Sequence, residues 1–421
     1  MKISTLSYLY SCLFILSTTL MISGCFKEAS QKDEPKNEFS IETAIELSAQ
    51  YLTRICLKNG MFEYRINTNP SVNVLDKYNM LRHAGTIYAL ANYHSLKANT
   101  QVLDALNRSG NYLKQVALKP VPEQKNTLAI WSFPEVTHSN NEQQVKLGGT
   151  GLGLVALLSI EKIQPGFTSL NKLIGLGNGI LFMQKENGSF YSKYIPSAGG
   201  LTDQWNSLYY PGEAALGLAM LYEIDPAEKW IISAYKAMEY LALSRKGQPN
   251  LPADHWALLA TEKILKHQQV VAGLINEDLL INHATQVCES ILNSQITSPA
   301  KGVYYGGFNT KGNTTPTATR LEGLQAALNF LPEHMAIRKK ITKAVDLGIG
   351  FLLHAQIKEG KYTGAIPRAI SPLPQNEPDS KSFNKRVTEI RIDYIQHAMS
   401  AMMQYQQFKK SNPIALPNSE K

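Results

Sequence analysis

Apolar side chains recur at spacings of three and four along most of the chain, which is the pattern of amphipathic helices. The helical segments fall into six pairs. The first helices of the pairs are predicted to begin near Ile41, Val102, Ser169, Lys229, Ala284 and Ile341. The second helices are predicted to begin near Leu81, Gly148, Gly212, Asp254, Arg320 and Arg391. A repeat of this length indicates one large unit, in which each pair covers the apolar faces of its neighbours.

A short motif lies between the two helices of several pairs. It reads Asn59-Gly60-Met61-Phe62, Asn187-Gly188-Ser189-Phe190, Lys301-Gly302-Val303-Tyr304 and Glu359-Gly360-Lys361-Tyr362. A glutamine precedes three of the copies, at Gln184, Gln295 and Gln356. The glycine supplies the left-handed residue that ends a helix, and the aromatic side chain can fold back over that end.

Paired helices joined by this motif resemble the (α/α)6 toroid, or six-hairpin glycosidase-like, superfamily. The Gln…Gly-x-aromatic element also resembles the repeat of prenyltransferases and squalene-hopene cyclases. The resemblance covers roughly residues 41–407 and implies an all-α fold, an (α/α)6 toroid of six helical hairpins. The toroid domain is expected over 41–408 and a disordered tail over 409–421. In such rings the second helices lie inside, and their first turns surround one cleft.

The N-terminal segment has the features of an export signal. One lysine precedes an apolar run that is short for a membrane-spanning helix, and Ile22-Ser23-Gly24-Cys25 follows. This box resembles bacterial lipoprotein signals, which implies that Cys25 becomes the lipidated first residue of the mature chain. We therefore expect a signal peptide over 1–24 and a flexible tether over 25–40. Because Phe26 rather than an aspartate follows the cysteine, the resemblance implies a lipid-anchored protein of the bacterial envelope, at the outer membrane and facing the periplasm.

Charge and composition exclude several classes of function. The formal net charge is +8, but basic residues are scattered, so a nucleic acid partner is not expected. Cys56 and Cys288 lie in apolar helical patterns and are predicted to be buried free thiols, although a disulfide is the alternative. Cysteine and histidine show no zinc-type spacing, and neither a metal nor a cofactor is expected. The glycine-rich run 149–153 indicates close helix packing rather than a nucleotide-binding loop, since no Gly-Lys-Ser/Thr follows it.

Polar and aromatic residues concentrate at the predicted starts of the inner helices. Three carboxylates there are candidates for acid–base catalysis: Glu213, Asp254 and Asp393. Candidates for substrate binding are Tyr78, Arg82, His83, Trp205, Tyr209, Tyr210, His255, Trp256, Glu322, Arg391 and Tyr394. Such a ring of carboxylates, guanidiniums and aromatic rings suits a sugar. The alternative for any single member is structural, because acidic groups at helix starts are often caps or partners of the helix dipole.

Three functions are compatible with this pattern. The first is a glycoside hydrolase that uses inner-ring carboxylates on a poly- or oligosaccharide. The second is a uronate lyase or C5-epimerase acting on an anionic polysaccharide, since Arg391-Ile392-Asp393-Tyr394 resembles an element of glucuronyl C5-epimerases. In that case an arginine would neutralise the uronate carboxylate, and a tyrosine or histidine would move the proton. The third is a glycan-binding or scaffold lipoprotein without catalysis. In each case the expected partners are a glycan and, through Cys25, a membrane.

Overall fold

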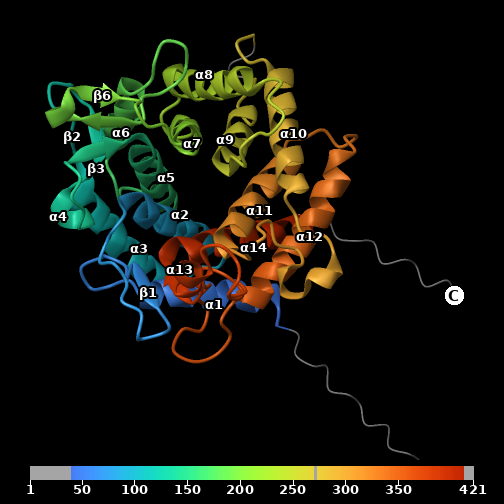
Figure 1. Cartoon of the computed structure of the whole chain (residues 1–421). Helices are drawn as coiled ribbons and strands as arrows, with labels where there is room; N and C mark the ends of the chain where they lie inside the picture. Colours follow the sequence, from blue (N-terminus) through green and yellow to red (C-terminus); the bar gives the residue numbers. More distant parts are fainter. Residues whose placement is uncertain (1–38, 270–272, 412–421) are drawn as a thin grey trace, which may run out of the picture. The chain divides into compact units, whose positions relative to one another are not determined.

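The computed structural model describes residues 39–269 and 273–411, and it shows the expected all-α (α/α)6 toroid (Figure 1). The first helices of the hairpins are α1 (Ile41–Arg54), α3 (Thr100–Tyr112), α6 (Leu170–Phe182), α8 (Glu228–Arg245), α10 (Glu277–Asn293) and α12 (Ile337–Ala355). The second helices are α2 (Met80–Leu96), α5 (Leu147–Ile163), α7 (Tyr210–Tyr222), α9 (His255–Leu265), α11 (Thr314–Leu328) and α14 (Ile392–Ser411). The predicted pairing of helices is therefore confirmed.

The second helices form a closed inner ring. Each contacts the next in the order α2, α5, α7, α9, α11 and α14, and α14 returns to α2. The first helices lie outside, where α1 packs on α14, α3 on α2, α8 on α7 and α12 on α11. Contact between the last inner helix and the first closes the ring, so all the inner helices can direct their first turns toward a common end.

Small residues let the inner helices approach closely. A Cβ atom at Gly151 of α5 would lie 2.8 Å from the Ala214 nitrogen of α7, and one at Gly212 would lie 2.6 Å from the Ala257 nitrogen of α9. In α5, residues 147–160 are all buried, as expected for a helix surrounded by other helices. The glycine-rich run 149–153 thus lies inside α5, which confirms its interpretation as a packing surface and excludes a phosphate-binding loop.

The glycine motif ends the outer helices as predicted in two of its four copies. Gly60 and Gly188 have φ values of +91° and +86°, and Phe62 and Phe190 are buried. Phe190 forms a β-bridge with Gln184, as Phe62 does with the residue at the corresponding position, Cys56. The chain therefore turns back over the end of α1 and of α6 and covers it with an aromatic ring.

In the other two copies the predicted register was wrong by four residues. The equivalent positions are Gly306 and Gly364, with φ values of +86° and +91°, and the buried plugs are Phe308 and Ile366. Hydrogen bonds from the preceding glutamine side chains establish this alignment. Gln295 Nε2 donates to Gly306 O at 3.1 Å and to the next outer helix at Ala344 O, 2.8 Å away. Gln184 binds Gly188 O and Ser233 O in the same way, and Gln356 binds Gly364 O and Ala44 O.

This alignment gives a prediction for two neighbouring glycines. Gly364 and Gly360 both have positive φ, at +91° and +80°, so alanine at either carries a backbone penalty of about 1–2 kcal/mol. A Cβ at Gly364 would also collide with Leu47 O of α1, whereas one at Gly360 meets nothing within 4 Å. We expect Gly364→Ala to lower the free energy of unfolding by about 1–3 kcal/mol more than Gly360→Ala. Urea denaturation of the two variants measures this difference. An equal loss of unfolding free energy in both would contradict the assignment of Gly364, rather than Gly360, as the equivalent of Gly60 and Gly188.

Short strands, which the sequence analysis did not predict, join the helices at one end of the ring. Strands β1 (Arg65–Asn67) and β7 (Glu389–Arg391) pair antiparallel, with Arg65 opposite Arg391. A second sheet has the order β2 (Leu118–Pro120), β3 (Leu128–Ser132), β4 (Gln144–Lys146), β5 (Lys193–Ile195) and β6 (Gly200–Thr202). The short helices α4 (Pro134–Thr137) and α13 (Ser380–Asn384) lie in the same connections. Because β4 and β7 run directly into α5 and α14, these strands fix where the inner helices begin.

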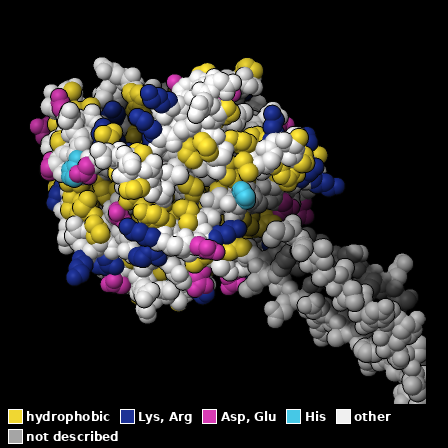
Figure 2. Space-filling model, turned by 60° about the horizontal axis from the view of Figure 1, so that its bottom comes forward, with side chains coloured by type: hydrophobic (Ala, Val, Ile, Leu, Met, Phe, Trp, Pro, Cys, Tyr) yellow, Lys and Arg dark blue, Asp and Glu magenta, His cyan; other side chains and the backbone are white. Residues whose placement is uncertain are grey.

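Outside the ring interior the structure adds three observations. Cys56 and Cys288 are buried free thiols, as predicted. On the face drawn in Figure 2, basic side chains are interspersed with acidic and apolar ones. Among the described residues, none of the helices is long and apolar enough to cross a membrane.

The predicted signal peptide, Cys25 and most of the tether and tail lie outside the described residues. Helix α14 reaches Ser411, beyond the expected end of the toroid at residue 408.

Candidate functional site

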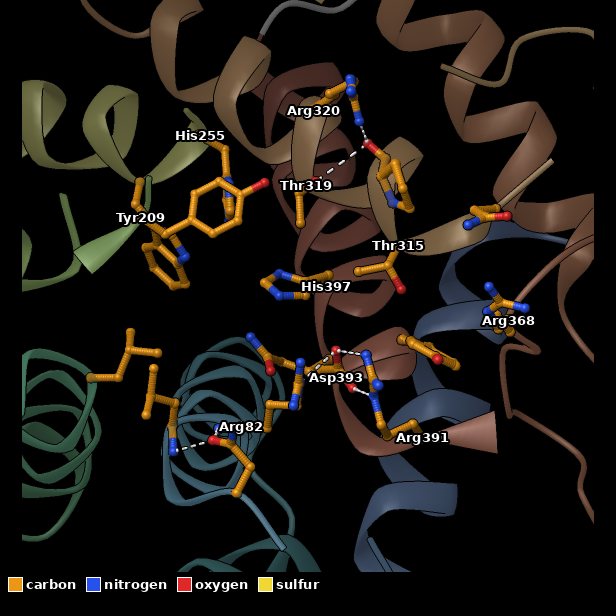
Figure 3. Close-up of a pocket in the computed structure, with 18 of the residues that line it drawn as sticks. Arg82, Tyr209, His255, Thr315, Thr319, Arg320, Arg368, Arg391, Asp393 and His397 are labelled. Carbon is orange, nitrogen blue, oxygen red and sulfur yellow. Dashed lines mark hydrogen bonds and ion pairs between the residues drawn. The ribbon is translucent and has the colours of Figure 1, made fainter. Parts of the chain in front are cut away.

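A cavity of about 620 Å³ opens where the inner helices begin (Figure 3). Helices α2, α7, α9, α11 and α14 contribute the first turns that surround it, and the connections before α11 and α14 add further side chains. The residues that line it include Arg82, Tyr209, Tyr210, Glu213, His255, Trp256, Asn309, Asn313, Thr315, Thr319, Arg320, Arg368, Arg386, Arg391, Asp393, Tyr394 and His397. The cavity is therefore the cleft that the repeat pattern predicted.

Two histidines from different inner helices meet in this cavity. His255 begins α9 and His397 lies in the second turn of α14, and their ring centroids are 5.5 Å apart with the rings edge to face. His397 Nδ1 is hydrogen-bonded to Glu322 Oε2 of α11 at 2.7 Å. The nearest distance from His255 to that carboxylate is 3.9 Å, and neither ring nitrogen of His255 has a hydrogen-bond partner among the described residues. One imidazole is thus anchored by a carboxylate, and the other is available.

The surroundings shift the pKa values of the two imidazoles in opposite directions. Burial, reinforced by the charges of His397 and Arg320, holds the pKa of His255 well below its ordinary value. Burial also acts to lower the pKa of His397, but the Glu322 carboxylate outweighs it and raises that pKa. Burial therefore favours the neutral form of His255, whose ring nitrogens are free to accept a proton, whereas Glu322 favours the protonated form of His397, which can donate one.

An arginine–aspartate–arginine cluster forms another wall of the cavity. Arg82 Nε donates to Asp393 Oδ2 at 3.0 Å, and Arg391 Nε and Nη2 donate to the two carboxylate oxygens at 2.5 and 2.9 Å. Burial acts to raise the pKa of Asp393, but Arg82 and Arg391 lower it to about 2. Asp393 is consequently an ionised group that orients two guanidiniums. Both of its oxygens already accept hydrogen bonds from guanidiniums, which disfavours the general-base part of the catalytic role predicted for it.

Glu213 is the carboxyl group of the cavity that stays protonated. Its side chain is 4% exposed, and Oε2 has no hydrogen-bond partner in the described part of the chain. Burial, followed by the charge of Asp254, raises its pKa to about 8. Gly148 leaves room for this carboxyl, because a Cβ there would collide with Oε2 and with the Tyr210 ring. Glu213 can therefore act as a hydrogen-bond donor or a general acid at neutral pH.

The raised pKa of Glu213 predicts how stability depends on pH. The folded protein keeps a proton that the unfolded chain has lost, so ionisation of Glu213 destabilises the fold. As pH rises from 4.5 to about 8, this group should lower the free energy of unfolding by about 1.4 kcal/mol per pH unit. The contribution levels off above the folded-state pKa. Urea denaturation of wild type and Glu213→Gln across this range isolates the effect, and parallel pH profiles would contradict it.

Five predicted site residues do not line the cavity, and three of these pack between helices behind it. Asp254, placed here as a catalytic carboxylate, is fully buried behind it, where its side chain caps α9 at Ala257 N and pairs with Arg245 Nη2 at 2.8 Å. His83 is also fully buried, bonded to Tyr78 Oη at 2.7 Å and to Ser109 O at 3.0 Å. The Tyr78 hydroxyl in turn accepts a hydrogen bond from Phe62 N. These side chains hold the inner ring to the outer ring, and their predicted roles in catalysis and binding are corrected accordingly.

The remaining predicted residues lie in or beside the cavity. Arg82, Tyr209, Tyr210, Glu213, His255, Trp256, Arg391, Asp393 and Tyr394 line it. Glu322 lies behind His397, which it anchors. Trp205 is 52% exposed and packs edge to face on Tyr210 at 5.6 Å, next to a lining residue. Their roles toward a substrate stay predictions.

Among the arginines and histidines that line the cavity, four were missed as site residues. His397 lies four residues after Asp393 on the same helix, a spacing that places both on one face and could have identified it. Arg320 lies in the second turn of α11, at the position where the sequence pattern predicted the helix to begin, so the rule that selected the others could have included it. Arg368 and Arg386 come from the long connection between α12 and α14, where the sequence carries no periodic signal. Only the tertiary structure brings these two arginines to the cavity.

The expectation that no metal binds remains untested. His255, Glu322 and His397 offer ligand atoms that all lie within 4.8 Å of one another. Two imidazoles and a carboxylate are a donor set that zinc and other divalent transition metals accept. These three residues are the candidate ligands in residues 39–269 and 273–411 should a metal bind.

The fold and the cavity define this chain as an (α/α)6 toroid with a polar, cationic active-site-like cleft. Solved structures share the fold. A D-mannose isomerase matches with a TM-score of 0.61 at 11% identity, covering 87% of this chain and 97% of the other. A sugar epimerase from a ruminal bacterium matches with a TM-score of 0.61 at 12% identity, covering 87% of this chain and 98% of the other. An unsaturated glucuronyl hydrolase specific for heparin matches with a TM-score of 0.59 at 11% identity, covering 88% of this chain and 98% of the other.

The sequence itself matches no family model and no curated protein. The structural likeness confirms the six-hairpin toroid that the repeat pattern predicted. At these identities it establishes the fold alone. The function must therefore be inferred from the residues of the cavity.

Proposed function

We propose that this protein is a sugar isomerase or epimerase, which moves a proton at a carbon atom beside a carbonyl group. The observation that carries the proposal is the pair His255 and His397, which face one cavity and have pKa values shifted in opposite directions. Proton transfer at carbon needs a base and an acid that are available together at the same pH, and such a pair supplies both. The sugar enzymes among the structural neighbours support this choice.

The chemistry follows from the positions of the charged groups. Neutral His255 takes the proton from the carbon next to the carbonyl, and the electron pair of that C–H bond forms a carbon–carbon double bond. The carbonyl oxygen receives a proton from His397, so an enediol results. To give the isomer, His255 delivers its proton to the neighbouring carbon while the hydroxyl of the first carbon returns a proton to His397 and becomes the new carbonyl. To give the epimer, the enediol oxygen returns its proton to His397, which protonates the same carbon on its opposite face, and the proton on His255 passes back to His397 through solvent. Arg82 and Arg391, fixed by Asp393, stabilise negative charge that develops on the oxygens.

The test is proton exchange with solvent. The purified protein is incubated in D₂O with a panel of aldoses, ketoses, uronates and oligosaccharides, and the products are read by NMR. We expect deuterium at the carbon beside the carbonyl, with no new reducing ends. A parallel incubation with EDTA separates proton transfer by the histidines from a reaction that needs a metal on His255, Glu322 and His397. Binding of a sugar without exchange or cleavage would instead support the glycan-binding alternative.

Glycoside hydrolysis is the second candidate, and Glu213 is the observation that favours it. A buried carboxyl with a pKa near 8 is suited to protonate a leaving oxygen. Hydrolysis also needs a second carboxylate as base or nucleophile, and both oxygens of Asp393 are already bound by guanidiniums. A uronate lyase or C5-epimerase would use the proton chemistry described above at C5. New reducing ends indicate hydrolysis, ultraviolet absorbance of an unsaturated product indicates elimination, and deuterium at C5 without cleavage indicates C5-epimerisation.

The N-terminal sequence supports a proposal for where in the cell the protein acts. We infer that Cys25 is lipidated and anchors the toroid to the bacterial envelope, with the cleft available to envelope glycans. The support is the lipobox Ile22–Cys25 in the sequence. Metabolic labelling with a fatty acid should mark the wild-type protein and fail to mark Cys25→Ser. Labelling of both, or of neither, contradicts the anchor.

A further inference from the structure

The arginines around the cavity outnumber the carboxylates that pair with them. Asp393 is shared by Arg82 and Arg391, as described above. Glu389 is bound by Arg386 through two contacts of 2.9 Å, and Arg65 lies 3.7 Å from the same carboxylate. Each of the two carboxylates thus already serves two guanidiniums.

Arg368 forms no ion pair with a carboxylate among the described residues. Its Nη1 donates a hydrogen bond to Phe383 O at 3.3 Å, and its guanidinium carbon lies 4.6 Å from the centroid of the Phe383 ring. Burial, followed by the charge of Arg386, lowers its pKa, and this outweighs the opposite effects of Tyr394 and Glu389. A half-buried guanidinium among others of the same sign gains most from a negatively charged partner.

The backbone holds Arg368 at the cavity wall. Its N–H donates to Glu389 O at 2.7 Å, and its carbonyl accepts from Thr314 N at 3.0 Å. The connection that carries Arg368 is therefore tied both to the strand before α14 and to the first turn of α11. The side chain extends from a fixed position, so a ligand group that reaches it meets a preorganised donor.

Arg320 adds a second guanidinium without a carboxylate partner in the described part of the chain. Its Nη1 donates to Pro316 O at 3.0 Å, while its buried Nε has no hydrogen-bond partner. In Figure 3 the labelled Arg320, Arg368, Arg391 and Arg82 lie on different sides of the imidazole of His397. The cavity as a whole is thus positively charged around the histidine pair.

We propose that the cavity takes a sugar that carries an oxyanion, a carboxylate or a phosphate, and that Arg368 binds this group. The inference rests on the proposed function, since it names the substrate class for the same site. A neutral hydroxyl can accept one hydrogen bond from a guanidinium but leaves its charge uncompensated. A planar carboxylate or a phosphate accepts two parallel N–H bonds and neutralises the charge as well. Arg386, with its charge already paired to Glu389, borders the subsite.

The test is a binding measurement that does not depend on turnover. Calorimetric titration of wild type with glucuronate, galacturonate, glucose 6-phosphate and glucose gives the dissociation constants. We expect at least one oxyanionic sugar to bind about tenfold or more tightly than glucose, and the comparison of uronates with the phosphate identifies the preferred oxyanion. Arg368→Gln should reduce that preference by about tenfold or more, and Arg368→Lys should reduce it less, because it keeps the charge but not the planar fork. Lys339→Gln, which removes an exposed positive charge on α12, is the matched control and should leave the preference unchanged.

Each outcome decides the subsite separately from the reaction. A wild-type protein that binds glucose as tightly as every oxyanionic sugar overturns the proposal, as does an equal loss of preference in Lys339→Gln and Arg368→Gln. Circular dichroism and thermal melting of the variants show whether a loss reflects unfolding, and the wild-type comparison needs no variant. If the preference depends on Arg368 but no sugar exchanges deuterium, the subsite stands and the proposed isomerase function fails. If only neutral sugars bind and exchange, the function stands and the subsite fails.

Discussion

Replacing His397 by asparagine is expected to reduce the rate of proton exchange at the sugar carbon by a factor of about 10²–10⁴. Asparagine places its amide nitrogen near the position of Nδ1, so the contact with Glu322, 2.7 Å in the wild type, can be kept. The variant loses the imidazole, which is the group that gains and releases the proton. His255→Asn should have an effect of similar size, because it removes the base while the rest of the cavity is unchanged.

The pH profile separates the roles of the two histidines. Since the pKa of His255 is lowered and that of His397 is raised, wild-type activity should fall at low pH as His255 gains a proton. It should fall at high pH as His397 loses one. His397→Asn should lose the alkaline limb, and His255→Asn should lose the acid limb. Initial rates of deuterium incorporation between these limits provide the measurement.

His334→Asn is the matched control, because that histidine is exposed on the surface and does not line the cavity. Its rate should equal that of wild type. If both cavity variants keep full exchange activity while a variant of Glu213 abolishes cleavage of a glycan, the histidine mechanism is wrong and hydrolysis is favoured. Unchanged binding of the substrate to the two histidine variants would show that the loss lies in the chemical step.

Asp254→Asn is expected to lower the free energy of unfolding by about 3–5 kcal/mol. The substitution leaves the guanidinium of Arg245 buried without its carboxylate, and Arg245 itself is 8% exposed. Asparagine can still cap Ala257 N, so the variant isolates the lost ion pair from the lost cap. Asp254→Ala, which loses both, should be less stable by about another 1 kcal/mol.

A double variant tests the physical cause. Asp254→Asn combined with Arg245→Met removes both charges and should recover much of the stability that the single variant loses. Urea denaturation of the four proteins gives the coupling energy. A stable Asp254→Asn protein that has lost all activity would restore the catalytic role predicted from the sequence. Retention of activity by whatever fraction remains folded is the expected result, because Asp254 does not reach the cavity.

The helical periodicity was sufficient to predict the repeated hairpins, because every hairpin must bury its apolar face against the neighbouring hairpins. The predicted starts at Ile41, Leu81 and Gly148 lie at or next to the observed starts of α1, α2 and α5. The largest error was at α10, which begins at Glu277 rather than near Ala284. A signal was present there, since Asn276 caps the helix and two acidic residues follow it. The β-strands carried no such signal, because they are three to five residues long and form only where connections meet.

Adjacent residues at the helix starts differ in whether they face the cavity, and the sequence pattern does not distinguish them. Arg82 and His83 are neighbours, as are Asp254 and His255, yet one member of each pair lines the cavity and the other lies behind it. Successive side chains on a helix point about 100° apart, so a first turn presents some residues inward and others to the outer helices. Periodicity locates the turn, but the rotation of each helix about its axis is set by packing against its neighbours.

The resemblance to six-hairpin toroids implied which helices lie inside and at which end the chemistry collects. By itself, the sequence determined that twelve helices follow one another as six hairpins. It did so because the apolar spacing and the glycine-terminated hairpins are local properties of the chain. The tertiary structure decided which charges meet: Arg82 binds Asp393 across 311 residues, and Glu322 anchors His397 from another helix. Those meetings fix which carboxyl is ionised, which imidazole is neutral and which arginine is unpaired. Protonation depends on burial and on the nearest charges in space, and neither can be read from order along the chain.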